Sequence, residues 1–537
     1  MIKTAQAVLK YHEETKHLPF RYAPSPGAMD WATEPSPYRR YSGAGEIGLP
    51  LLKRDPPGGY EELFTRSSEP GPFSMENIAA FLELSLGLSA QKSFMDSSWA
   101  LRMNPSSGNL HPTESYIITL EEAAHRGVFH YTPEAHALEK RASLLEPLAD
   151  MIKKSFRTEG LMACLTSIDW REAWKYGARA FRYSCLDTGH AAAAMSFSAA
   201  LLGWKITHLS ALSDEAVRRM LGFNNIKWTE YEEERIEAAF FVHRAGEPPE
   251  DTELSGKIIK TFGEVEFKGA PNCLSPDHVQ WPQIESVARA AEKVSTEPET
   301  GPSPPPREFL HNKPINMTGA SVIRGRRSAQ AFNRDVRVSK EDFFTIIDST
   351  VPRPSHSPFD MLHGGPRINI LLFVHRVTGL SKGLYMLIRN NNDRQELERK
   401  MKKTFLWQET ELKDLYLLME GDLSDEARYL FCQQDIGGDS VFAAAMIAGF
   451  RENIEKRPSS YRGLFMEAGM AGQVLYIAAE AVGLRGTGIG CFYDDMTHEL
   501  MGFSAEDDTF QSLYHFTVGA PLLDSRITTA DPYAHIR

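Results

Sequence analysis

Two stretches of the chain align without a gap at a constant offset of 280: residues 182–223, RYSCLDTGHAAAAMSFSAALLGWKITHLSALSDEAVRRMLGF, and residues 462–503, RGLFMEAGMAGQVLYIAAEAVGLRGTGIGCFYDDMTHELMGF. Nine of the 42 aligned positions are identical, among them Gly189 with Gly469 and Asp214 with Asp494. Both stretches have the pattern of a small-residue helix, a glycine stop, a short apolar stretch, an acidic turn and a second helix. We interpret the chain as two copies of one unit.

The alanine-rich part of each stretch, residues 191–202 and 471–482, predicts a helix at the centre of the protein. Both segments are apolar nearly all round, and each ends at a glycine, Gly203 or Gly483, as a helix with a C-cap glycine does. Small side chains let two helix backbones approach closely, and pairing buries both apolar surfaces. We expect the two helices to lie side by side at the interface of an intramolecular pseudo-dimer.

Each half also contains signals for further helices and strands. Ser74 and Ser339 precede acidic first turns, as N-cap residues do, and apolar strands are expected at residues 116–120 and 368–374. The predicted fold class is therefore α+β, with two tandem domains of the same kind.

A proline-rich stretch, STEPETGPSPPP at residues 295–306, has no apolar residue to bury and predicts a solvated, extended linker. We therefore divide the chain into an N-terminal domain with an N-terminal arm (1–255), a linker region (256–318) and a C-terminal domain (319–537).

Composition excludes several classes of protein. The 537 residues carry 59 lysines and arginines against 71 aspartates and glutamates, and this net charge of −12 disfavours binding to nucleic acid or to an anionic membrane. No stretch is long and apolar enough to span a bilayer, and residues 1–16 lack the apolar core of a secretory signal, so we expect a cytoplasmic protein. The five cysteines form no CxxC pair, so we expect no metal site.

Three polar motifs are candidates for a binding site. RGRRSAQ (324–330) groups arginines and a serine that suit a phosphate dianion. RMNPSSGNLHP (102–112) groups hydroxyls, an amide and a glycine that could bind the polar edge of a planar heterocycle. TGIG (487–490) would let backbone N–H groups approach a ligand closely. Each motif alone is also explained by an ordinary turn.

As an ordered set, the motifs resemble those of the nitroreductase-fold flavoproteins. The closer resemblance is to the SagB/ThcOx type, which includes azoline oxidases, and it is carried by WALRMNPSSGNLHPTESY (99–116) and WKYGARAFRYSCLDTGH (174–190). The C-terminal half, from RRSAQAF to FTVGAP (516–521), resembles a plainer nitroreductase domain.

The resemblance implies an FMN site built from both halves. The implied cofactor-binding residues are Arg324, Arg326, Ser328 and Arg526 for the phosphate, and Arg102, Ser106, Ser107, Asn109, Gly488 and Gly490 for the remainder of the flavin.

The mirrored site is degraded. Residues 207–210 replace its glycine turn, and only residues 354–356 survive of its proline-serine motif, although Arg39, Arg40 and Ser42 could imitate the phosphate-binding element. We therefore expect one functional flavin site.

Lys175 and Tyr176 are the catalytic residues that the resemblance implies. They match a Lys-Tyr pair that supplies proton transfer in azoline oxidases. The C-terminal half has Glu455 and Lys456 at the corresponding offset, so the pair is confined to one site.

The predicted function is FMN-dependent dehydrogenation of a peptide-derived or small heterocyclic or amine substrate. Two alternatives stay open: an NAD(P)H-dependent nitro or quinone reductase, and a flavin-free scaffold that binds a peptide or partner protein. NAD(P)H is a partner only in the first alternative, and further oligomerisation is left open.

Overall fold

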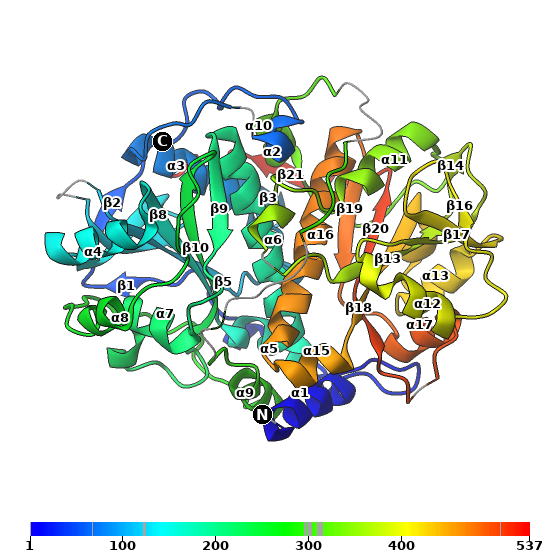
Figure 1. Cartoon of the computed structure of the whole chain (residues 1–537), viewed down its shortest axis with the longest axis horizontal. Helices are drawn as coiled ribbons and strands as arrows, with labels where there is room; N and C mark the ends of the chain where they lie inside the picture. Colours follow the sequence, from blue (N-terminus) through cyan, green and yellow to red (C-terminus); the bar gives the residue numbers. More distant parts are fainter. Residues whose placement is uncertain are drawn as a thin grey trace.

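Two seven-stranded sheets flank a central pair of long helices (Figure 1). The computed structural model describes residues 2–66, 68–121, 125–294, 297, 303–308, 315–362, 364–504 and 506–537. Most of the predicted linker stretch 295–306 lies outside these residues. The mixture of helices and antiparallel sheets confirms the predicted α+β class.

The two sheets repeat one strand order. In the N-terminal half it is β2 (Gly45–Gly48), β7 (Ala137–Ser143), β6 (Gly127–Thr132), β5 (Thr113–Thr119), β8 (Gly160–Ser167), β10 (Arg235–Arg244) and β9 (Trp204–His208). In the C-terminal half it is β16 (Gln408–Glu409), β17 (Leu415–Glu420), β15 (Gly383–Leu387), β13 (Ile368–Val374), β18 (Phe442–Gly449), β20 (Phe510–Gly519) and β19 (Arg485–Ile489). β5 and β13, which fall on the two predicted strands, hold equivalent places, so the halves are related by a pseudo-two-fold axis.

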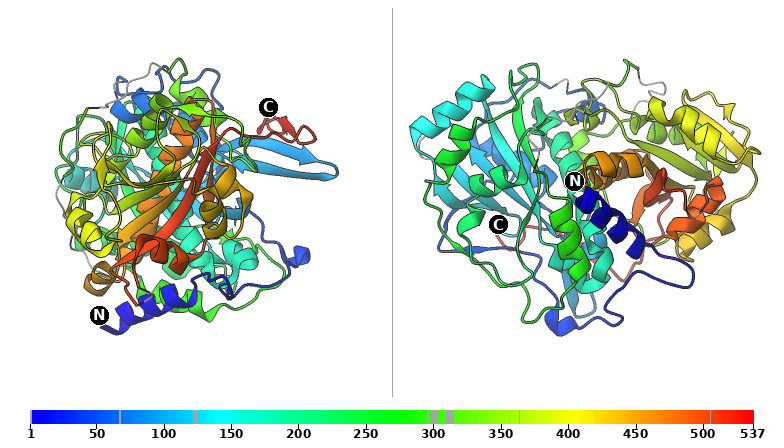
Figure 2. Two further views of the ribbon diagram at one scale, coloured as in Figure 1. Left: turned by 90° about the vertical axis from the view of Figure 1, so that its right-hand side faces the viewer. Right: turned by 60° about the horizontal axis from the view of Figure 1, so that its bottom comes forward.

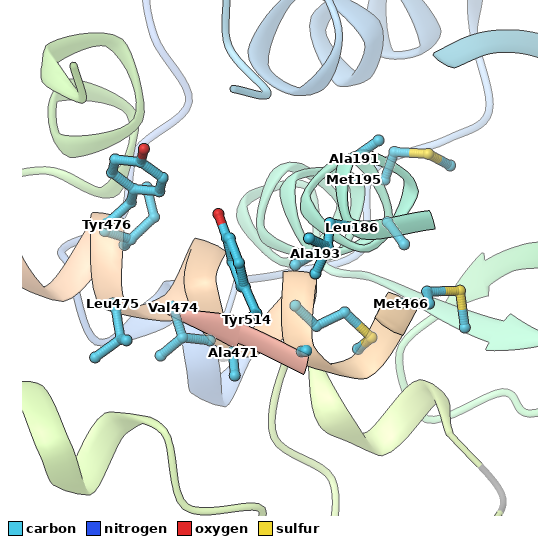
Figure 3. Close-up of a cluster of buried hydrophobic side chains, with 14 of the residues drawn as sticks. Leu186, Ala191, Ala193, Met195, Met466, Ala471, Val474, Leu475, Tyr476 and Tyr514 are labelled. Atoms are coloured by element: carbon cyan, nitrogen blue, oxygen red, sulfur yellow. The ribbon is translucent and has the colours of Figure 1, made fainter. Parts of the chain in front are cut away.

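The sheets meet through α6 (Ala180–Leu201) and α16 (Ser460–Ala481), which lie side by side (Figure 1). The helices cross where Gly189 faces Gly469, and a Cβ on either glycine would lie within 2.1 Å of a carbonyl oxygen of the other helix. Figure 3 shows the apolar side chains packed around this crossing. The predicted helix pair at the interface of an intramolecular pseudo-dimer is confirmed.

Helices cover the sheets, and two of them begin at the predicted N-caps. Ser74 caps α3 (Met75–Ser85) and Ser339 caps α11 (Lys340–Ser349), each accepting a backbone N–H of the first turn with its side chain. The other elements of the two halves are α2 (Glu62–Thr65), α4 (Glu146–Phe156), α5 (Asp169–Tyr176), α7 (Asp214–Met220), α10 (Gly319–Gly325), α12 (Arg394–Lys400), α13 (Ser424–Leu430), α14 (Asp435–Asp439), α17 (Asp494–Met501), β1 (Tyr41–Ser42), β12 (Val338–Ser339) and β14 (Val377–Thr378). No helix among the described residues is long and apolar enough to cross a membrane.

The N-terminal arm carries α1 (Ile2–Glu14), which packs against α9 (Pro282–Ala290) and against α15 (Arg451–Lys456) of the other half (Figure 1). The region predicted as a linker also contains α8 (Gly256–Phe262) and β11 (Ala270–Pro271). β11 pairs with β1 and α8 contacts α7, so this part of the region packs on the N-terminal half.

The far end of the chain crosses back to the N-terminal half. β21 (Thr528–Ala530) pairs with β3 (Leu88–Phe94), whose other neighbour is β4 (Ser97–Arg102). The β3–β4 hairpin projects from the body of the protein (Figure 2). The third strand of this small sheet, β21, therefore comes from the C-terminal half.

Candidate functional site

A cavity of about 790 Å³ opens between the two halves, at the base of the β3–β4 hairpin. Its walls come from the loop after β4, the segment after α10, the helices α6 and α16, β19 and the chain after β20. Among the lining residues are Arg102, Ser106, Ser107, Asn109, Arg326, Ser328, Gly488 and Gly490. The structure thus brings most of the predicted cofactor-binding residues to one cavity.

One end of the cavity is strongly basic, because Arg326, Arg327 and Arg485 all line it. The Arg326 side chain is only 3% exposed, and its Nε has no hydrogen-bond partner among the described residues. Burial, with Arg326 beside it, lowers the pKa of Arg327 to about 10. Arg327 and Arg485 are half-buried beside Arg326, and Arg327 also donates to the backbone carbonyls of Arg324, Arg326 and Ser89. Guanidinium groups gathered in this way favour a bound anion.

Tyr476 on α16 organises this end of the cavity. Its hydroxyl lies 2.8 Å from Ser328 Oγ and accepts the N–H of Gly488 at 3.0 Å. A Cβ on Gly488 would lie 1.7 Å from the Tyr514 hydroxyl, and one on Gly490 would lie 2.3 Å from the Tyr183 ring. The glycines are therefore required by neighbouring tyrosines, and the Gly488 N–H is already bound within the protein.

The proline-serine loop forms the opposite wall. Ser107 donates its N–H and its hydroxyl to Asp187 on α6, at 3.1 and 3.0 Å. Ser106 Oγ accepts the N–H of His111 at 2.8 Å, and Asn109 Oδ1 lies 3.0 Å from His111 Nε2. These bonds hold the loop against the interface helix.

Two carboxylic acids lie beneath the loop. Burial raises the pKa of Asp187 to about 7, although hydrogen bonds from Ser106 and Ser107 act in the opposite direction. Burial, followed by the neighbouring Asp187, raises the pKa of Glu172 well above its ordinary value. The pair can therefore hold a proton beside the cavity near neutral pH.

Lys175 and Tyr176 lie directly behind the cavity wall. A Cβ on Gly108, which lines the cavity, would lie 2.7 Å from the Tyr176 hydroxyl and 3.2 Å from Lys175 Nζ. Burial raises the pKa of Tyr176 well above its ordinary value, so the phenol is protonated. The predicted pair thus adjoins the cavity, although neither side chain is among the described residues that line it.

Two predicted phosphate ligands lie elsewhere. Arg324 binds Asp55 at 2.9 Å and Glu83 at 2.7 Å, which holds its guanidinium away from the cavity. Arg526 is 72% exposed and pairs with Asp524. Arg102 lines the cavity, but its guanidinium donates to backbone carbonyls at 2.5 and 3.4 Å.

The mirrored position is recognisable from the offset of 280. Arg66 follows α2 as Arg326 follows α10, and its guanidinium lies 3.4 Å from the Ser196 hydroxyl. In the alignment, Ser196 is the counterpart of Tyr476. The Arg326 guanidinium lies over the Tyr476 ring, 5.2 Å from its centroid. Arg66 is therefore the structural counterpart of Arg326.

A carboxylate fills this mirrored position. Asp360 binds Arg66 through both oxygens at 2.7 Å, and Lys205, the counterpart of Arg485, at 3.1 Å. The cavity that remains is about 360 Å³. Both basic side chains of the mirrored position are thus already paired with a carboxylate of the protein.

The prediction that Arg39, Arg40 and Ser42 imitate the phosphate element is wrong. Arg39 is buried against Glu234, with its Nε 3.2 Å from the carboxylate. Arg40 pairs with Glu139 at 2.8 Å. These carboxylates engage both guanidinium groups, and neither arginine lines the mirrored cavity.

Sequence reasoning missed Arg327, Arg485 and Asp187. Arg327 stands in the RGRRSAQ motif and Arg485 two residues before TGIG, so both could have been read from those motifs. Asp187 could have been found as a carboxylate within the small-residue helix. Among the described residues, no group of three or more His, Cys, Asp and Glu side chains could hold a metal ion.

Comparison with known proteins agrees with this architecture. The nitroreductase family model matches residues 70–232 and 323–520, whereas no curated protein matches the chain. A putative nitroreductase from Anabaena variabilis is 21% identical, with a TM-score of 0.67 over 96% of this chain and 99% of that chain. A weaker match is the E. coli microcin synthetase McbBCD complex with truncated pro-MccB17 bound, at 17% identity and a TM-score of 0.26 over 46% of this chain and 94% of that chain. Another is the NADPH:FMN oxidoreductase from Vibrio harveyi complexed with NAD+, at 16% identity and a TM-score of 0.22 over 38% of this chain and 68% of that chain. Since the family model matches a segment in each half and more than half of the residues, the chain belongs to the nitroreductase family of oxidoreductases.

Proposed function

We propose that the chain is an FMN-dependent oxidoreductase that binds one FMN in the cavity between its halves. The observation that carries this proposal is the cluster of Arg326, Arg327 and Arg485, none of which forms an ion pair with a carboxylate of the described residues. Glu480 acts electrostatically on all three arginines, but burial raises the pKa of its own carboxyl group. A phosphate dianion would supply the missing charge and accept bidentate hydrogen bonds.

The polar residues that line the rest of the cavity, and its volume, suit the other parts of FMN. Ser328 would bind the phosphate beside the arginines, while Ser106, Ser107 and Asn109 present polar groups on the opposite wall. A volume of about 790 Å³ lies within the usual range for small-molecule and cofactor sites. The mirrored position offers neither this volume nor free basic charge, which supports one FMN per chain.

The chemistry supplied by bound FMN is acceptance of a hydride from the substrate. The protein has to hold the substrate and move the accompanying proton. Tyr176 and Lys175 adjoin the cavity behind Gly108, and Asp187 lines it with a pKa near neutrality. We assign proton transfer to Lys175 and Tyr176, since a positioned acid or base contributes about 10² to 10⁴ in rate.

The Lys-Tyr pair is the reason to favour a SagB/ThcOx-type dehydrogenase acting on a peptide-derived or small heterocyclic or amine substrate. Membership in the nitroreductase family equally supports an NAD(P)H-dependent nitro or quinone reductase. The electron acceptor distinguishes the two. Oxidation of an azoline-containing peptide with dioxygen and without NAD(P)H would support the dehydrogenase, whereas NAD(P)H-dependent reduction of a quinone would assign the reductase.

The first test is cofactor stoichiometry. The purified full chain is incubated with FMN, separated from free flavin and denatured, and the released FMN is measured against protein. We expect one FMN per chain. No retained flavin would refute the proposal and favour a flavin-free scaffold, and two would show that the mirrored position also binds.

A further inference from the structure

Two free thiols, Cys432 and Cys491, lie on neighbouring segments, and Cys491 directly adjoins the cavity-lining Gly490. Cys491 directly follows Gly490, and Cys432 lies in the turn after α13. The two segments are held side by side because Tyr493 N–H donates to the Leu430 carbonyl at 2.8 Å and the Gln434 side chain donates to the Cys491 carbonyl at 3.3 Å. The two thiols shift each other's pKa in opposite directions.

A histidine from the N-terminal arm completes this thiol cluster. His17 Nδ1 accepts the backbone N–H of Ala23 at 2.9 Å, which leaves Nε2 to carry the ring proton. His17 also acts on Cys491 and lowers the pKa of that thiol. Burial lowers the pKa of His17, so the ring acts on the sulfur as a neutral donor near pH 7.

The surroundings favour a thiolate at Cys491 and a thiol at Cys432. The neighbouring Cys432 thiol, together with His17 and the Arg179 guanidinium, lowers the pKa of Cys491 to about 5 against the effect of burial. The neighbouring Cys491, then burial, raises the pKa of Cys432 far above its ordinary value. The charged and titratable groups that act on the pair are His17, Arg179, Asp494, Tyr22, Tyr176 and Tyr183.

Small reagents can reach the pair. Cys432 and Cys491 are both partly exposed, whereas Cys164 and Cys185 are buried. Reactive cysteines in proteins combine this kind of partial exposure with an electropositive, hydrogen-bonding environment. No step of the proposed flavin chemistry uses either thiol.

We propose that Cys491 and Cys432 form a redox-active dithiol whose substrate is hydrogen peroxide or a small hydroperoxide. The Cys491 sulfur attacks one peroxide oxygen, the O–O bond breaks, and the second oxygen leaves as water after protonation. Cys432 then attacks the Cys491 sulfenic acid, the S–S bond forms, and the hydroxyl leaves as water with the remaining proton. Overall, two thiols lose two electrons and two protons, and hydrogen peroxide is reduced to two waters.

The test begins with the reduced full chain, labelled briefly with iodoacetamide at pH 6 and mapped by peptide mass spectrometry. Cys273 is the internal control, because it is the more exposed thiol and lies outside the pair. Cys491 should be alkylated about tenfold faster than Cys273, since its larger thiolate fraction outweighs the lower nucleophilicity of a low-pKa thiolate. His17→Phe should slow alkylation of Cys491 and leave the rate at Cys273 unchanged.

The second measurement adds hydrogen peroxide to the reduced chain. The wild type should form a disulfide between Cys432 and Cys491, and Cys432→Ser should instead accumulate a sulfenic acid at Cys491 that dimedone traps. Faster alkylation of Cys273 than of Cys491, or persistence of both free thiols after peroxide treatment of the wild type, would overturn the proposal. Neither measurement depends on FMN or on turnover, so a failure here is distinct from a failure of the proposed function.

Discussion

Asp360 accepts hydrogen bonds from Arg66 with both carboxylate oxygens, each 2.7 Å from a guanidinium nitrogen, at the counterpart of the Arg326 position in the other half. The two basic partners of Asp360, Arg66 and Lys205, are the counterparts of Arg326 and Arg485. A carboxylate of the protein therefore lies at this position in one half, and this supports the proposal of a single usable site.

Asp360→Asn should expose this mirrored position to anions. Because Arg66 and Lys205 lose their carboxylate, the variant should be destabilised by about 3 to 5 kcal/mol, the cost of breaking a buried ion pair. Inorganic phosphate should raise its melting temperature more than it raises that of the wild type. Asp425→Asn, which removes a carboxylate that is 92% exposed, is the matched control and should show neither effect.

Arg326→Ala should weaken FMN binding about tenfold to a hundredfold, because a hydrogen bond to a charged group contributes about 1.5 to 3 kcal/mol. The measurement is the Kd for FMN by fluorescence titration. Arg526→Ala removes a predicted phosphate ligand that the structure leaves at the surface, so it should bind FMN like the wild type. A larger loss in Arg526→Ala than in Arg326→Ala would contradict the site described here.

Lys175→Ala and Tyr176→Phe should retain FMN and fold but lose turnover by about 10² to 10⁴. Lys456 stands at the equivalent offset to Tyr176 in the other half and is 70% exposed, so Lys456→Ala is the control for loss of a lysine. Unchanged turnover in both site variants would show that the pair is structural.

Asp187 should make the free energy of unfolding depend on pH. Its pKa is raised from 3.8 to about 7 in the folded protein, so the folded state holds a proton that the unfolded state has released. The contribution of Asp187 to the free energy of unfolding is fully present below pH 3.8. It is lost as the pH rises through about 7, at up to about 1.4 kcal/mol per pH unit. Asp187→Asn should flatten the profile over this range in urea titrations, and an unchanged slope would contradict the assignment.

Gly189→Ala should destabilise the protein by about 1 to 3 kcal/mol, as overpacking of a tight contact does. The new Cβ would lie 2.0 Å from the carbonyl oxygen of Met466, so the two interface helices must separate. Gly256→Ala, on α8, meets no atom within 4 Å and should change the melting temperature little. Equal stability of the two variants would argue against the close helix crossing.

The helix pair could be predicted from the sequence because small residues and glycines recur at a fixed offset, whereas the exact ligands of the phosphate position could not. α10 ends at Gly325, so Arg324 belongs to its last turn and meets Asp55 and Glu83. Arg326 lies beyond that end and turns into the cavity. The motif contains both arginines, and only the position of the helix end separates their roles.

Contacts between segments far apart in the sequence were also unpredictable. Arg66 and Asp360 meet across the interface of the halves, and neither belongs to a motif that points to the other. Asp187 is visible in the sequence as a carboxylate within the small-residue helix, but its raised pKa arises from burial beneath a loop, and the sequence does not reveal that depth.

The pairing of β21 with β3 has a consequence for how the protein is made. Roughly 430 residues separate the two strands, and at synthesis rates of about 5 to 20 residues per second the edge of the hairpin waits about 20 to 90 seconds on the ribosome for its partner. An unpaired strand edge is a template for association with other chains. The nascent N-terminal half therefore passes through a period in which its hairpin is open to misassembly, and the cavity beside it acquires its final wall only when the distant strand emerges.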